Sequence, residues 1–180
     1  VVRLEEAQAS YITDVTSVEK PVVTPVIDKL LAAFPNLPTV VLSRYEEQRK
    51  ALRTRFRNRI ILPSDVVDGP SLIASATLVV GAGGTMNQEA CLLGVPVISC
   101  YPGAELEVEK FLMKEKLLYR IPDPMKAAEK AVEILQNRHK YQTTQLRRAS
   151  RFLTGMENPA EVISSWILKA REQLNKRVTT

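Results

Sequence analysis

The stretch Thr77-Leu-Val-Val-Gly-Ala-Gly-Gly-Thr-Met-Asn-Gln-Glu-Ala-Cys-Leu-Leu-Gly-Val-Pro-Val-Ile-Ser99 decides the fold, because it combines a strand, a glycine turn, a helix and a second strand. Residues 78–80 form a short apolar run of the kind found in parallel strands covered on both faces. Gly81, Gly83 and Gly84 permit positive φ and allow a bulky partner to approach the backbone. The stretch therefore predicts one βαβ unit of an α/β protein.

The helix of this unit is predicted to begin at Thr85, where apolar residues start to recur at spacings of three and four, and Gly94 supplies its C′ residue. The free amides at the helix start and the positive end of its dipole favour an anion such as phosphate. Glu89 follows one turn into the helix, where its carboxylate could accept hydrogen bonds from hydroxyl groups such as those of a ribose. The pattern thus indicates a phosphate-binding turn.

Length and composition indicate one soluble domain. A chain of 180 residues can bury a full core without a disulfide or metal. Cys91 and Cys100 lie inside apolar runs, so we expect two reduced, buried thiols in a cytoplasmic protein, with a bridge between them as the alternative. No signal segment, long apolar span or lipidation motif is visible. The chain opens on Val1, and we expect it to be part of a longer protein.

The net charge of +5 is concentrated between Arg44 and Arg59, where seven basic residues accompany two acidic ones. Leu52 and Phe56 are four residues apart, which predicts an amphipathic helix with a solvated basic face. A phosphate-bearing ligand or an anionic surface is the alternative partner of these charges. Nucleic-acid binding is disfavoured because no aromatic-rich recognition motif accompanies the basic run.

Strands alternate with helices along the whole chain. The predicted strands cover residues 1–4, 39–42, 59–62, 78–80, 95–100 and 117–121. The predicted helices cover residues 25–34, the basic run within 44–59, 72–75, 85–93, 105–116, 125–137, 141–153 and 159–176. This order predicts a doubly wound, parallel six-stranded sheet in a three-layer αβα sandwich, with ligands at the carboxyl ends of the strands. Polar residues cluster where the first strand ends, namely Glu5, Glu6, Ser10 and Tyr11.

Other candidate residues favour structural roles. His139 lies in a polar helix end, so we expect it on the surface. Glu105, Glu107 and Glu109 follow the fifth predicted strand; a solvated helix start is favoured, with a position facing the cleft as the alternative. Trp166 is expected to pack the last helix on the sheet. No metal-ligand cluster is visible, and we expect no cofactor.

The glycine turn departs from two common phosphate-binding fingerprints. Met86 stands where the dinucleotide fingerprint requires its third glycine, and the turn lacks the Gly-Lys-Ser/Thr ending of a P-loop. Instead, Gly94 follows Glu89 by five residues and Pro96 follows it by seven. With the glycine turn, this spacing resembles the C-terminal, nucleotide-sugar-binding half of GT-B glycosyltransferases and of UDP-N-acetylglucosamine 2-epimerase.

A closer resemblance is to an uncharacterised, largely archaeal family of GT-B-like proteins. It rests on Gly-Ala-Gly-Gly-Thr-Met-Asn-Gln-Glu-Ala at 81–90, on Val-Asp-Gly at 67–69 and on Val-Arg-Leu-Glu at 2–5. This resemblance implies a Rossmann-like fold and a complete protein of about twice this length, in which the present chain is the C-terminal half and an N-terminal domain is its partner.

The resemblance also implies site residues. The backbone of Ala82, Gly83, Gly84 and Thr85 would bind the diphosphate of a UDP-sugar-like donor, and Glu89 would bind the ribose. Arg3 occupies the region from which GT-B proteins often contact a phosphate or a sugar.

The chain departs from the epimerase pattern in two ways: Ala82 replaces a serine, and the interval from Gly84 to Glu89 is one residue longer. No residue matches a catalytic acid or base, so the catalytic residues are unknown. The sequence therefore predicts the donor-binding half of a glycosyltransferase or 2-epimerase-like enzyme, inactive in isolation. A non-catalytic nucleotide-binding or protein-interaction domain is the alternative.

Overall fold

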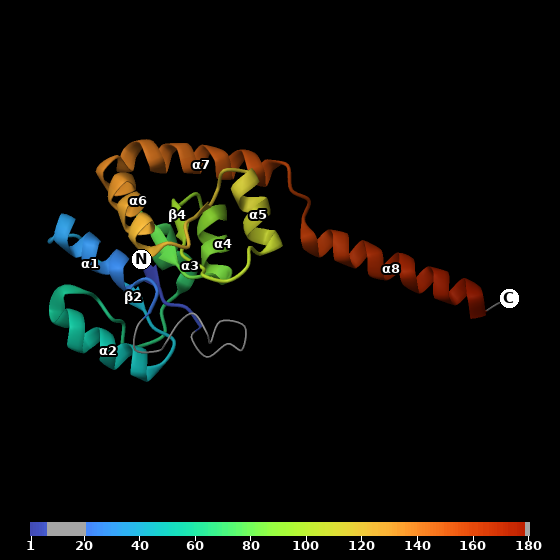
Figure 1. Ribbon diagram of the computed structural model, residues 1–180. Helices are drawn as coiled ribbons and strands as arrows, with labels where there is room; N and C mark the ends of the chain where they lie inside the picture. The colour runs from blue at the N-terminus through green and yellow to red at the C-terminus, as the bar shows by residue number, and fades with distance from the viewer. Residues whose placement is uncertain (7–20, 179–180) are drawn as a thin grey trace. The chain divides into compact units, whose positions relative to one another are not determined.

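A computed structural model describes residues 1–6 and 21–178 of the protein (Figure 1). The predicted polar cluster after the first strand extends to Ser10 and Tyr11, which lie outside the described residues. The chain forms two compact units, Val1–Ser150 and Arg151–Thr180, and each is described by itself. Within the described residues, every helix is too short or too polar to serve as a membrane span.

The first unit is built on a parallel five-stranded sheet with the order β2-β1-β3-β4-β5. Its strands are β1 (Val2–Arg3), β2 (Val41–Leu42), β3 (Val79–Gly81), β4 (Val97–Ser99) and β5 (Tyr119–Arg120). β1 and β3 are neighbours in register, with Val2 opposite Val80 and Arg3 opposite Gly81. The polar ends of β1, β3 and β4 therefore meet at one edge of the sheet, as the sequence predicted for an α/β protein.

The prediction that residues 59–62 form the third of six strands was wrong, because the sheet has five strands and none of them lies there. Residues Arg57–Arg59 form a short 3₁₀ helix, and the segment contacts the sheet through the single bridge between Val40 and Ile61. Ile61 makes both hydrogen bonds of this bridge, to Thr39 and Val41. The next residue that would donate to the ladder is Pro63, which has no N–H, so the pairing ends after one residue.

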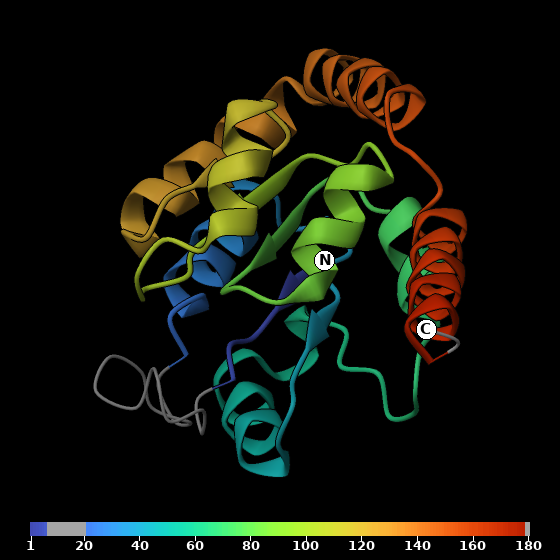
Figure 2. The ribbon, with the colours of Figure 1, turned by 90° about the vertical axis from the view of Figure 1, so that its right-hand side faces the viewer.

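Helices cover both faces of the sheet. They are α1 (Thr24–Ala33), α2 (Glu46–Phe56), α3 (Gly69–Ala74), α4 (Thr85–Leu92), α5 (Glu107–Lys114), α6 (Pro124–Gln136) and α7 (Arg138–Thr154). Helices α1 and α6 pack against each other on one face, whereas α3 and α4 pack on the other (Figures 1 and 2). The predicted positions of all these helices are confirmed to within a few residues.

The core of the first unit lies between the sheet and these helices. The β-branched strand residues Val41, Val80 and Ile98 are buried against Leu52 and Phe56 of α2 and the small residues of α6. The four-residue spacing of Leu52 and Phe56 thus correctly predicted the buried face of the basic helix. Cys91 and Cys100 are free and buried, and burial raises the pKa of each thiol to about 12, so both are apolar core residues.

The second unit contains α8 (Pro159–Val178). Trp166 is 73% exposed, and Ile163 and Ile167 are exposed beside it. The packing of Trp166 on the sheet that the sequence predicts would join the two units, so it stays a prediction. Helical spacing indicates that three apolar residues share a face, but it does not identify what covers that face.

Candidate functional site

The glycine turn joins the end of β3 to the start of α4. Gly83 and Gly84 have φ of 87° and 93°, which side chains rarely adopt. Gly84 is the N-cap of α4 and has no side chain to bond the first amides. By contrast, α3 and α6 begin at Asp68 and Asp123, whose carboxylates accept hydrogen bonds from the amides of their first turns. The start of α4 is thus left available for an external anion.

Two side chains, those of Asn87 and Tyr101, lie against this turn. A Cβ on Gly81 would lie 2.4 Å from Oδ1 of the buried Asn87, so that position excludes any side chain. A Cβ on Gly83 would lie 3.0 Å from Cδ2 of Tyr101, which places the tyrosine ring against the turn. The glycines therefore permit close packing on one side of the backbone as well as the positive φ values.

A cavity of about 340 Å³ lies beside the turn, at the carboxyl ends of β1, β3 and β4. We call it the glycine-turn cavity. It is lined by Leu4, Glu6, Arg44, Ala82, Gly83, Gly84, Tyr101 and Leu106. Its lining has a charged part, formed by Glu6 and Arg44, and an apolar part, formed by the leucine side chains and the tyrosine ring. Such a cavity suits a ligand that is anionic at one end and less polar at the other.

Arg44 supplies the positive charge of the cavity. It lies two residues after β2, and its guanidinium lies next to the turn, with Nη2 4.0 Å from the position of a Cβ on Gly84. Its backbone N–H donates to Oε1 of the buried Gln48 at 2.9 Å, and Gln48 in turn donates to the backbone oxygen of Glu5 at 3.2 Å. This bridge holds the segments after β1 and β2 together. Arg44 Nη1 forms an ion pair with Glu6 Oε2 at 2.8 Å.

Arg3 lies outside the lining of the cavity. Its Nη1 donates to the backbone oxygen of Ser43 at 3.1 Å, so it supports the segment that carries Arg44. Burial lowers the pKa of Arg3, the nearby Arg44 guanidinium lowers it further, and Glu6 raises it. The guanidinium groups of Arg3 and Arg44 therefore lie near the Glu6 carboxylate at this edge of the sheet.

The six residues predicted for the site fall into two sets. Ala82, Gly83 and Gly84 line the cavity, as the phosphate-turn hypothesis requires. Arg3, Thr85 and Glu89 do not line it; Thr85 and Glu89 are exposed on the first two turns of α4. The sequence also missed lining residues, namely Leu4, Arg44, Tyr101 and Leu106. For Arg44 and Tyr101, the available signal was their position just after the predicted strands over residues 39–42 and 95–100.

Glu109 differs from the solvated position that the sequence favoured. Its side chain is 5% exposed and forms an ion pair from Oε2 to Arg120 Nε at 3.2 Å. Oε1 accepts a hydrogen bond from Ser99 Oγ at 2.5 Å. Glu105 and Glu107 are exposed, as expected of a helix start, and so is His139. Within the described residues, no group of three or more potential metal ligands occurs.

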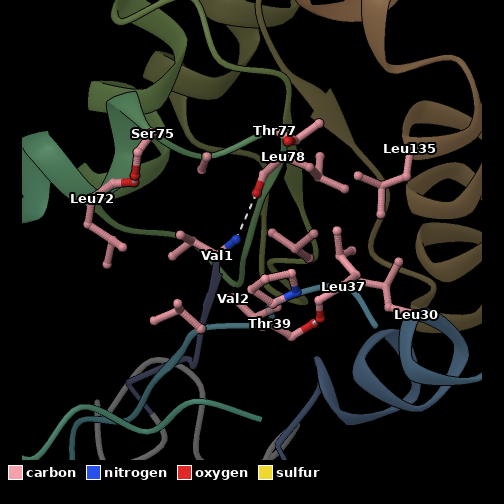
Figure 3. A pocket seen from close by; sticks show the side chains of 14 residues that line it. Val1, Val2, Leu30, Leu37, Thr39, Leu72, Ser75, Thr77, Leu78 and Leu135 are labelled. Carbon is pink, nitrogen blue, oxygen red and sulfur yellow. Dashed lines mark hydrogen bonds between the residues drawn. The ribbon is translucent and has the colours of Figure 1, made fainter. Parts of the chain in front are cut away.

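A second cavity, of about 260 Å³, lies at the opposite edge of the sheet, where the strands begin (Figure 3). We call it the amino-edge cavity. Its lining is mainly apolar and includes Val1, Leu30, Leu78 and Leu135. The backbone nitrogen of Val1 donates to the backbone oxygen of Leu78 at 2.9 Å, as the dashed line in Figure 3 marks.

The fold is shared with solved epimerase structures. A structure from Listeria monocytogenes, provisionally assigned as a UDP-N-acetylglucosamine 2-epimerase, matches 84% of this chain with a TM-score of 0.60 and 16% identity. The UDP-GlcNAc 2-epimerase of Neisseria meningitidis, solved with UDP-GlcNAc, matches 93% with a TM-score of 0.56 and 14% identity. The MnaA protein of S. aureus, solved with UDP, matches 81% with a TM-score of 0.57 and 15% identity.

These matches define the class: a Rossmann-like α/β domain that corresponds to one half of the GT-B epimerase structures. The chain spans 42%, 43% and 37% of the Listeria, Neisseria and S. aureus proteins, respectively.

The chain belongs to a family described as a protein of unknown function, DUF354, whose model matches residues 1–164. A protein of Methanocaldococcus jannaschii, itself uncharacterised, is 35% identical over 101 residues, which cover 56% of this chain and 28% of that protein.

Proposed function

We propose that this domain binds the nucleotide-sugar donor of a glycosyltransferase or 2-epimerase-like enzyme. The diphosphate binds at the turn of residues 81–85, between the amides at the start of α4 and the guanidinium of Arg44. The nucleotide sugar is a UDP-sugar or a close analogue of one. The domain acts together with a second, N-terminal domain that supplies the acceptor site and the catalytic acid or base.

The observation that carries this proposal is the uncapped start of α4 beside an arginine. Gly84 provides no capping side chain, and the Arg44 guanidinium lies next to it. Backbone amides, a helix dipole and a guanidinium together form a binding site for an anion that carries more than one negative charge. The matched structures with UDP and UDP-GlcNAc make a nucleoside diphosphate the first candidate for that anion.

The expected chemistry depends on binding rather than on a reactive side chain of this domain. When a glycosidic bond to a diphosphate breaks, negative charge develops on the departing phosphate oxygens. The α4 amides and Arg44 would stabilise that charge more strongly than they stabilise the bound donor, which lowers the barrier. Glu89 is exposed on the second turn of α4, where its carboxylate can accept hydrogen bonds from the ribose hydroxyls.

Calorimetric titration of the full chain with UDP, UDP-GlcNAc, GDP and TDP tests the proposal. We expect at least one of these compounds to bind, with UDP or UDP-GlcNAc the tightest. Glu89→Ala should weaken the binding of the nucleotides and leave the binding of inorganic pyrophosphate unchanged, because pyrophosphate has no ribose. Glu129→Ala, an exposed glutamate on α6, is the matched control.

The outcomes separate the parts of the proposal. If no nucleoside diphosphate binds, the donor-site assignment fails, and a protein-interaction domain becomes the better description. If UDP binds equally well to the wild type and to Glu89→Ala, the ribose role of Glu89 fails while the diphosphate site stands. Tight binding of a nucleic acid with steep salt dependence would instead assign the function to the basic face of α2.

A further inference from the structure

The segment after β4 forms the apolar side of the glycine-turn cavity. Tyr101 lines the cavity, and its ring is packed between two glycines: a Cβ on Gly83 would lie 3.0 Å from Cδ2, and a Cβ on Gly103 would lie 2.7 Å from the hydroxyl oxygen. The ring is thus fitted to both its own loop and the glycine turn. Any shift of residues 101–103 moves the ring relative to the turn.

Arg120 holds this loop from the neighbouring strand. Its Nη2 donates to the backbone oxygen of Gly103 at 2.6 Å and to that of Tyr101 at 3.4 Å. Its Nε donates to Glu109 at 3.2 Å. One guanidinium therefore contacts two carbonyl groups of the loop and a carboxylate of α5, an arrangement that the planar, forked donors of arginine allow and an ammonium group does not.

Glu109 joins Arg120 to the end of β4. Its second carboxylate oxygen accepts from Ser99 Oγ, and Ser99 is the register partner of Arg120 in the β4–β5 pair. Ser99 Oγ also accepts the backbone N–H of Tyr101 at 3.4 Å. The side chains of Glu109 and Arg120 are only 5% and 15% exposed. A buried ion pair of this kind is a weak source of net stability, but it fixes geometry because few alternative arrangements satisfy both charges.

We propose that Arg120 and Glu109 are positioning residues of the glycine-turn cavity: they hold residues 101–103 so that the Tyr101 ring forms the wall against which the organic part of the ligand packs. This inference rests on the proposed function for the identity of the ligand. Neither Arg120 nor Glu109 lines the cavity, so both act through the loop. The anionic end of the ligand is bound by other groups, at the α4 start and at Arg44, and does not depend on this loop.

The first experiment compares UDP with inorganic pyrophosphate by calorimetry. Arg120→Met should weaken UDP binding about tenfold and change pyrophosphate binding less than twofold, because only UDP has an organic part to pack on Tyr101. Arg120→Lys keeps the charge beside Glu109 but loses the fork, and we expect an intermediate effect. Arg148→Met removes another arginine that donates to a backbone oxygen, that of Lys116, and should affect neither ligand.

The second experiment observes the ring without any ligand. In protein labelled with 3-fluorotyrosine, the ¹⁹F resonance of Tyr101 is assigned by its loss in Tyr101→Phe. Arg120→Met and Glu109→Gln should each move this resonance toward the shift of an exposed tyrosine, whereas Arg148→Met should not. If Arg120→Met does not fold, the same measurement is made on Arg120→Lys.

The two experiments give distinct failures. An unchanged Tyr101 resonance in the folded Arg120 variants would overturn the positioning role whether or not a ligand binds. If Arg120→Met weakened the binding of UDP and of pyrophosphate equally, the positioning role would also be overturned, because the substitution would then affect the anion site as much as the Tyr101 wall. Absence of binding to the wild type would contradict the proposed function, and the ¹⁹F measurement would still decide whether Arg120 positions the ring.

Discussion

The glycine-turn cavity and the amino-edge cavity lie at opposite edges of one sheet and have similar volumes, about 340 and 260 Å³. Their polar groups are arranged differently. In the amino-edge cavity, the hydroxyls of Thr39 and Ser75 donate to backbone oxygens two and three residues earlier. In the glycine-turn cavity, the amides at the α4 start have no side-chain cap, and an arginine lies beside them.

This comparison separates a space left by packing from a space suited to a ligand. A parallel sheet directs its strand ends, and the starts of the following helices, to one edge, so dipoles and loop side chains gather there. The other edge receives helix ends and tight connections, where the hydroxyls of Thr39 and Ser75 bond to nearby backbone oxygens. Volume alone does not distinguish the two cavities, whereas the arrangement of donors and charges does. The following changes test this distinction.

The largest effect is expected from Leu78→Ala at the amino-edge cavity. Leu78 is 5% exposed and lines that cavity, so its truncation removes buried contacts and enlarges an existing void. The free energy of unfolding should fall by about 2–5 kcal/mol. UDP affinity should stay unchanged in the folded protein. Denaturant unfolding measures the free energy of unfolding, and calorimetry measures UDP affinity. A variant that kept the stability of the wild type but lost UDP binding would contradict the distinction between the two cavities.

Arg44→Gln should have the opposite profile. Loss of a charge-assisted hydrogen bond to phosphate costs about 1.5–3 kcal/mol, which corresponds to a roughly 10- to 100-fold weaker UDP complex. Stability should change by less than about 1 kcal/mol, because the ion pair of Arg44 with Glu6 is partly exposed. Arg55→Gln is the matched control, since Arg55 also belongs to the basic run of residues 44–59 and forms an exposed ion pair, with Asp28 of α1. Equal weakening in both variants would indicate a diffuse charge effect rather than a site.

Glu5→Gln should change the pH dependence of stability. Burial raises the pKa of Glu5 above 4.5, so the ionised form is disfavoured in the folded state, and the wild type loses stability as the pH rises from 4.5 through the raised value. The slope is at most about 1.4 kcal/mol per pH unit. Glutamine keeps the acceptor for the Val22 N–H, which lies 2.7 Å from Oε1. In thermal unfolding between pH 4 and 8, the stability of Glu5→Gln relative to the wild type should therefore increase as the pH rises. If the stabilities of the two proteins changed with pH in the same way, the raised pKa of Glu5 would be refuted. Glu129→Gln is the control.

Glu6→Gln should have the smallest effect and should strengthen binding. The Glu6 carboxylate occupies Arg44 in the absence of ligand, and an exposed pair of this type is worth about 0.2–1 kcal/mol. Its removal should raise the affinity for UDP about two- to fivefold. Calorimetry measures this gain, and weaker binding would mean that Glu6 contacts the ligand itself.

The sequence predicted the glycine turn well, because the positive φ of Gly83, Gly84 and Gly94 restricts residue choice strongly. It wrongly predicted a strand over residues 59–62, where pairing with the sheet is limited to Ile61 because Pro63 has no N–H to continue it. It missed Arg44 as a cavity residue because the amphipathic pattern assigned this arginine to the helix, whereas the structure places it in the preceding loop. Helical spacing also could not show that Glu109 is buried, since its partners Ser99 and Arg120 lie on two other elements.

The ion pair between Glu6 and Arg44 has a consequence for the salt dependence of binding. If Arg44 were unpaired, an incoming diphosphate would release the counterions around its guanidinium, and affinity would fall steeply as salt is added. Because the Glu6 carboxylate already neutralises Arg44, the incoming diphosphate takes the place of that carboxylate beside the guanidinium. Binding is then an exchange of internal for external anions, and we expect a shallow dependence of affinity on ionic strength that becomes steeper when Glu6 is neutralised.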